Sequence, residues 1–262
     1  KKDKFIQDGK IKFSQFYEED INPSFEVGDG KLCRKERQWL QIEKVNNNDS
    51  SAWIDKKALK VEMDSWTYPL HFIDFETAAT AIPLNKGRHP YEGIAFQFSH
   101  HVVYDDGRVE HKGEYINTER GAFPNYEFVR RLKDELDQDK GTIFKYSPHE
   151  NTYLNMIYEQ LQTDKAVIAD KEDLCNFIQE VSHSKKDSIY SWEGERDMVD
   201  MLNLVKWYFY DPETNGSNSI KHVLPAILNS SDYLKEKYSM PIYGTDQIPS
   251  YNFKNKVWVE IE

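Results

Sequence analysis

Three segments between residues 68 and 116 alternate apolar and polar side chains, the pattern of strands that bury one face. They are YPLHFIDFET (68–77), IAFQFSHHVVY (94–104) and RVEHKGEYI (108–116). The Asp-Asp-Gly sequence between the last two is a tight-turn signal. We therefore expect an antiparallel meander of three strands.

Helical and strand-like patterns then alternate. Apolar residues recur every four positions in 125–138, which predicts an amphipathic helix, and the apolar run GTIFKYS (141–147) predicts a buried strand. Further helices are expected over 147–162, 171–181, 196–210 and 220–228. This order predicts an α/β domain over residues 61–262, preceded by an irregular N-terminal appendage over residues 1–60.

Composition restricts the class of partner. The formal net charge of −11 argues against a protein that holds nucleic acid through its overall field, although a carboxylate site neutralised by metal ions remains compatible with a nuclease. We find no run of about 18 apolar residues and no secretory leader, so we expect no membrane span and a cytoplasmic location. The oligomeric state is left open.

Two carboxylates stand two positions apart in FIDFET, so Asp74 and Glu76 share one face of the predicted strand. If they are buried together, a cation should lie between them, and Mg²⁺ or Mn²⁺ prefers such oxygen ligands. The alternative is a strand end in solvent, where both carboxylates form ordinary salt bridges.

Glu150 is a third candidate, because it begins the helix that follows the 141–147 strand. Loops at strand ends bring distant residues to one crevice, so Glu150 could face the same cleft as the FIDFET carboxylates. The sequence Ser147-Pro148-His149-Glu150 is also a capping box, in which Glu150 would only bond back to the amide of Ser147. Both interpretations stay open at this point.

The motifs together resemble a known superfamily. FIDFET resembles the first motif, and IFKYSPHENTYL the second, of the DEDD-type 3′ to 5′ exonucleases with a ribonuclease H-like fold. The ordered set DFET, HPYEGIAFQFSHHV, DKGTIFKYSPHENTYL, MVDML and NGSNSIKHVLPAI is similar to one prokaryotic family of unknown function within it, over roughly residues 70–230. The resemblance implies a mixed sheet, with the meander followed by parallel strands and flanked by helices.

The resemblance also implies a set of metal ligands. Asp74 and Glu76 match the acidic pair of the first motif, and Glu150 matches the acidic residue of the second. The fourth acidic residue is absent from its expected late motif, so either it lies beyond residue 262 or an internal residue replaces it. Asp200 is the best internal substitute, and it could equally be an ordinary helical Asp paired with Arg196.

The implied reaction is phosphodiester hydrolysis with two divalent ions about 4 Å apart. Candidate substrate contacts are Gln97 on the second strand, Ser147 where the family has Asn, and Lys221 with His222 at a helix N-terminus. His149 is a candidate general base, although a histidine at the start of a helix is more often simply exposed to solvent. Lys221 could likewise point only into water.

Two functions therefore compete. The first is a metal-dependent 3′ to 5′ exonuclease acting on DNA or RNA, with a single-stranded end as the expected substrate. The alternative is a catalytically impaired nuclease-like module that binds nucleic acid or a protein partner without cutting it. The absent last motif and the acidic net charge favour the second. A third possibility is the core of a longer enzyme.

Overall fold

The structure is a computed structural model that describes all residues except 1, 24–29, 187, 251–252 and 261–262. The chain divides into two compact units. One comprises Lys1–Ser65, Leu202–Gln247 and Tyr251–Glu262, and the other comprises Trp66–Met201 and Ile248–Ser250. Residues after Met201, which we assigned to the main domain, thus cluster mostly with the N-terminal residues rather than with the sheet.

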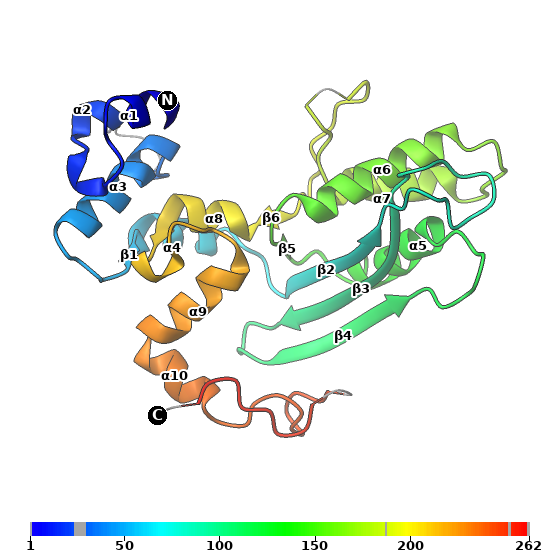
Figure 1. The fold of residues 1–262 in the computed structure, drawn as a ribbon. Helices are drawn as coiled ribbons and strands as arrows, with labels where there is room; N and C mark the ends of the chain where they lie inside the picture. The colour runs from blue at the N-terminus through cyan, green and yellow to red at the C-terminus, as the bar shows by residue number, and fades with distance from the viewer. Residues whose placement is uncertain (1, 24–29, 187, 251–252, 261–262) are drawn as a thin grey trace. The chain divides into compact units, whose positions relative to one another are not determined.

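The second unit contains a five-stranded sheet of order β4-β3-β2-β5-β6 (Figure 1). Its strands are β2 (Leu70–Ala78), β3 (Ile94–Val103), β4 (Val109–Ile116), β5 (Ile143–Lys145) and β6 (Val199–Asp200). The expected hairpin is present, because Val103 pairs with Val109 across the Asp-Asp-Gly turn. All three strands of the predicted meander are confirmed.

The sheet is mixed. β2 and β3 pair antiparallel, as do β3 and β4, whereas β5 pairs parallel with β2 and β6 pairs parallel with β5. An antiparallel meander continued by parallel strands is a ribonuclease H-like arrangement, so the predicted fold class is confirmed. In this order β5 lies between the strand with the DFET motif and the strand that ends at Asp200.

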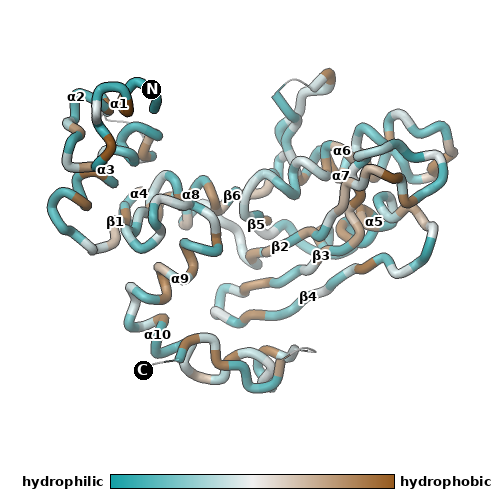
Figure 2. The backbone as a smooth tube through the Cα atoms, viewed as in Figure 1, coloured by the Kyte–Doolittle hydropathy of each residue, from teal (hydrophilic) through white to brown (hydrophobic). Residues whose placement is uncertain are grey.

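Three helices flank the sheet: α5 (Asn125–Leu136), α6 (His149–Thr163) and α7 (Lys171–Val181). Helix α5 contacts β3 and β4, and α7 packs on both α5 and α6. Phe75 and Phe98 on the sheet meet the fully buried Phe128 of α5 edge-on, at centroid distances of 4.7 and 5.4 Å. Apolar segments along β2, β3 and the helices, brown in Figure 2, form this core.

The first unit is more helical than expected. We predicted an irregular appendage over residues 1–60, but polar breaks there separate short helices. The helices of this unit are α1 (Lys2–Gln7), α2 (Glu18–Ile21), α3 (Arg34–Asn46), α4 (Lys56–Asp64), α8 (Met201–Tyr208), α9 (Ile220–Ser230) and α10 (Asp232–Tyr238). The short strands β1 (Trp53–Ile54) and β7 (Phe209–Tyr210) pair antiparallel, and η1 (Phe13–Gln15) and η2 (Pro212–Thr214) are 3₁₀ turns.

One expected helix begins later than predicted. We expected a helix over 196–210, but Val199 and Asp200 form β6 and the helix α8 starts at Met201. Parallel pairing of Phe144 with Val199 and of Lys145 with Asp200 holds these residues extended. Asp200 is therefore a strand-end residue and not a helical one. None of the described helices has the length and apolar character that a bilayer span requires.

Candidate active site

Asp74 and Glu76 lie in the second half of β2, where buried and exposed residues alternate. Ile73 and Phe75 are 5% and 4% exposed and face the helices, whereas Asp74 and Glu76 are exposed on the other face. The predicted sharing of one face is confirmed. Gln97 lies directly opposite Glu76 across the β2–β3 ladder, which places this substrate-binding candidate beside the acidic pair.

Glu150 lies in the first turn of α6 and is only 3% exposed. Its Oε2 atom is buried and has no hydrogen-bond partner among the described residues. Burial raises the pKa of this carboxyl to about 7; its own backbone N–H lowers the pKa in part. A carboxyl group in this state binds either a proton or a cation readily.

Asp200 accepts a hydrogen bond from the backbone N–H of Ser147 at 2.8 Å. The capping-box interpretation is therefore wrong, since the amide that Glu150 would need is bound to Asp200. Ser147 has φ of +91°, a strained conformation for a residue other than glycine, and α6 begins at His149 with Pro148 as its N-cap. Ser147 is therefore not the N-cap of α6.

The negative charges of Asp74 and Asp200 both raise the pKa of Glu150. Charges act on one another in this way only when they are near, so these three acids, distant in sequence, lie in one neighbourhood at the ends of the strands. Asp74 comes from β2, Asp200 from the end of β6 and Glu150 from the start of α6. A metal site shared by these acids stays a prediction.

A buried lysine beside these acids was not predicted from the sequence. Lys145, the last residue of β5, is 2% exposed and its Nζ donates to the carbonyl oxygen of Met198 at 2.7 Å. Its positive charge lowers the pKa of Glu150. The lysine in the apolar run GTIFKYS could have indicated acidic neighbours, because a lysine is almost never fully buried without a partner.

Other candidates have more ordinary surroundings. His149 is exposed, and its Nε2 lies 3.1 Å from Thr77 Oγ1, which ties the start of α6 to the end of β2. Lys221 and His222 are exposed in the first turn of α9, as expected for a helix start, and belong to the other unit. Asp246 is exposed in a loop of that unit.

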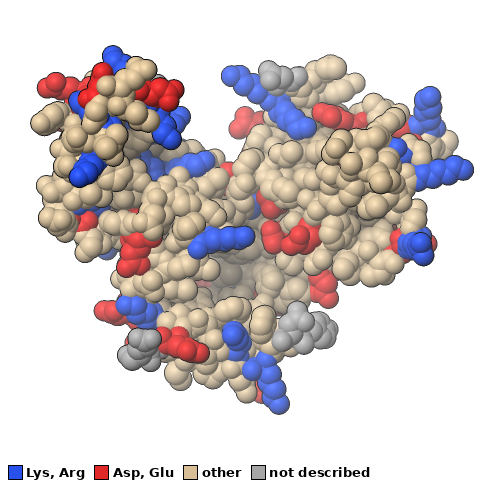
Figure 3. Space-filling model, viewed as in Figure 1, with Lys and Arg blue, Asp and Glu red and all other residues tan. Residues whose placement is uncertain are grey.

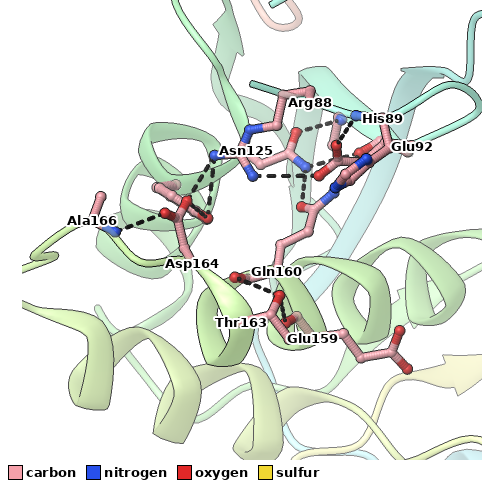
Figure 4. A network of polar contacts seen from close by, with 12 residues as sticks. Arg88, His89, Glu92, Asn125, Glu159, Gln160, Thr163, Asp164 and Ala166 are labelled. Carbon is pink, nitrogen blue, oxygen red and sulfur yellow. Dashed lines mark hydrogen bonds and ion pairs between the residues drawn. The ribbon is translucent and has the colours of Figure 1, made fainter. Parts of the chain in front are cut away.

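The loop that leaves β2 beside the acids is fixed by buried polar side chains (Figure 4). Asn125 and Gln160 both donate to the carbonyl oxygen of Gly93 at 3.0 Å, and Asn125 accepts from the amide of Ala95 at 2.9 Å. Arg88 binds Asp164 at 2.8 Å within the same network. The start of β3, which pairs with the end of β2, is thus held on α5 and α6.

Within the described part of the chain, no three His, Cys, Asp or Glu side chains are arranged as a ready metal-binding group. The donors nonetheless fit a hard divalent ion, because the site offers carboxylate oxygens only and one of them, Glu150 Oε2, is without a partner among the described residues.

Around the sheet unit, Lys and Arg side chains stand apart from one another with Asp and Glu between them on the face drawn in Figure 3.

Comparison with known proteins gives one match. No curated protein and no solved structure matches the chain. The sequence model of the domain of unknown function DUF2779 matches residues 71–219. This match covers more than half of the 262 residues and begins one residue after the start of β2. It contains the four acids and Lys145, and the chain therefore belongs to the DUF2779 family.

Proposed function

We propose that this chain hydrolyses phosphodiester bonds of nucleic acid with divalent metal ions, as a 3′ to 5′ exonuclease of the DEDD type. The observation that carries the proposal is the buried, unpartnered Oε2 of Glu150, whose carboxyl lies close enough to Asp74 and Asp200 for their charges to raise its pKa. Such a group is stable next to a cation and costly without one. The ribonuclease H-like sheet and the resemblance of the motifs point to the same chemistry.

The residues would divide the work as follows. Asp74, Glu76 and Glu150 would hold the ions, and Asp200 would supply the fourth acid. When bound, Mg²⁺ or Mn²⁺ provides an activated water and stabilises the leaving oxygen. Gln97, which lies opposite Glu76 across the ladder, would contact the substrate backbone. Ser147 lies between β5 and α6 along the chain, and its backbone N–H donates a hydrogen bond to Asp200.

A single-stranded end is the substrate that we favour. The chain carries a net charge of −11, and the cations of the sheet unit are dispersed on the face drawn in Figure 3, which does not favour a long duplex held through its phosphates. Recognition of a strand end needs few phosphate contacts. Lys221 and His222 remain predicted phosphate contacts.

The test is degradation of 5′-labelled single strands of DNA and RNA with Mg²⁺ or Mn²⁺. We expect Asp74→Asn to reduce cleavage by about a thousandfold or more, because an amide cannot supply an anionic metal ligand. Asp246→Asn is the matched control, since it makes the same change at an exposed loop position. Cleavage by Asp74→Asn at the rate of the parent would refute the assignment.

One observation favours the alternative of a binding module without activity. Among the described residues, no three or more His, Cys, Asp or Glu side chains are arranged as a metal-binding group. A metal-dependent enzyme can have such a group in place before the ion binds. The same labelled strands distinguish the two functions. A module of this kind would retard the strand in a gel with Mg²⁺ present and would leave its length unchanged, in the parent and in Asp74→Asn alike.

A further inference from the structure

Lys145 occupies an unusual place for a lysine. It ends the short strand β5, which lies between β2 and β6, pairs in register with Asp200 on β6, and is 2% exposed. Ile143 and Phe144, which precede it in β5, are each 1% exposed. A valine or leucine would fill such a position without the cost of removing an ammonium group from water.

The surroundings of Lys145 combine burial with acidic neighbours. Burial lowers the pKa of its ammonium group below the ordinary value, although the charges of Asp197, Asp200 and Glu150 raise it in part. Of these acids, Asp197 is also bound to Nδ1 of His183 at 2.8 Å, and Asp200 is also bound to the Ser147 amide. Among the described residues, Glu150 has an oxygen without a hydrogen-bond partner. Lys145, which pairs with Asp200 in the sheet, is therefore a buried basic residue inside the acidic cluster.

We propose that Lys145 is the resident counter-ion of the acidic site. As a positioning residue, it holds Glu150 and Asp200 together before a divalent ion binds, and its charge weakens the binding of that ion. The inference rests on the proposed function, because it concerns the same site. It adds a determinant of metal affinity that lies on β5, the strand between those that carry Asp74 and Asp200.

The direction of the effect follows from the charges. A divalent ion near Glu150 is repelled by the full charge of Lys145, and removal of that charge should tighten binding by about tenfold or more.

The experiment compares the full chain with Lys145→Met, Lys145→Gln and the control Lys140→Met. Lys140 has a side chain that is 68% exposed and pairs with Glu180, away from the acids. Melting temperature is measured in EDTA and then against Mn²⁺ concentration at pH 8, and bound Mn²⁺ is counted by equilibrium dialysis. Lys145→Gln retains a donor for the Met198 carbonyl oxygen and covers the case in which the methionine variant does not fold.

We expect both Lys145 variants to melt lower than the parent in EDTA and to reach half-saturation at a Mn²⁺ concentration about tenfold lower, with Lys140→Met unchanged. Half-saturation equal to or higher than that of the parent would overturn the role of Lys145 and leave the metal site standing. If neither the parent nor any variant binds Mn²⁺, both this inference and the proposed function are wrong.

Discussion

Glu150→Gln provides a quantitative test of the acidic site that does not depend on catalysis. The glutamine has the same shape as the glutamate but carries no charge. Burial raises the pKa of Glu150 from 4.5 to about 7, so the folded protein prefers the protonated form more than the unfolded chain does. At roughly 1.4 kcal/mol per pKa unit, ionisation of Glu150 costs about 3 kcal/mol of folding free energy.

The sign and the pH window follow from these values. Below the unfolded pKa of about 4.5 the group is protonated in both states and imposes no penalty. The penalty grows as the pH rises and is complete above about 7. Glu150→Gln should therefore match the parent near pH 4.5, and at pH 8 it should be more stable by about 3 kcal/mol.

The assay is urea unfolding in EDTA, followed by tryptophan fluorescence, at half-unit steps from pH 4.5 to 8.5. Trp66 and Trp192 report on the unit with the sheet, because each packs against an aromatic residue of that unit. Glu159→Gln, on an exposed position of the same helix, controls for the loss of a charge from α6. A stability difference that is the same at every pH would show that Glu150 is not a buried acid in the folded protein.

Two further changes test how the site is held. Gly141→Ala should lower the free energy of unfolding, measured in urea, by about 3 kcal/mol or more. The reason is that a Cβ at this position would meet the carbonyl oxygen of Pro69 at 1.9 Å. An unchanged free energy of unfolding would contradict this close approach. Asn125→Ala should cost about 2–4 kcal/mol by the same measurement, because it leaves the buried amide of Ala95 unpaired. Protection of that amide from hydrogen exchange should also fall, and unchanged protection would refute the assignment.

Local patterns predicted the parts of the fold that depend on local periodicity. Alternation over 68–116 and the Asp-Asp-Gly turn predicted the three strands β2, β3 and β4 and their antiparallel pairing. Periodic apolar residues likewise placed α5, and the approximate position of α6, correctly. These signals are read within about ten residues, where the physics of one strand or helix decides the structure.

Long-range pairing was harder to predict. Residues 196–210 have a helical pattern, yet Val199 and Asp200 are extended because β5 offers them a partner about 55 positions away in the chain. The same pairing places Asp200 where it accepts a hydrogen bond from the Ser147 amide, which in a capping box would bind Glu150. Lys145 was missed for a related reason, since a single lysine in an apolar run has no meaning until its acidic neighbours are known.

Three energetically unfavourable features gather at the edge of the sheet where these elements meet. Ser147 has a positive φ, Glu150 has a buried oxygen without a partner, and Lys145 is an ammonium group in the interior. The first two could each be relieved by one substitution, glycine for the serine or glutamine for the glutamate, whereas loss of the lysine alone would leave its acidic neighbours without their counter-ion. Sequences that serve only to fold tend to lose such features, whereas binding sites retain them. Their concentration at one place, next to Asp74 and Asp200, supports our proposal that this end of the sheet binds a cation.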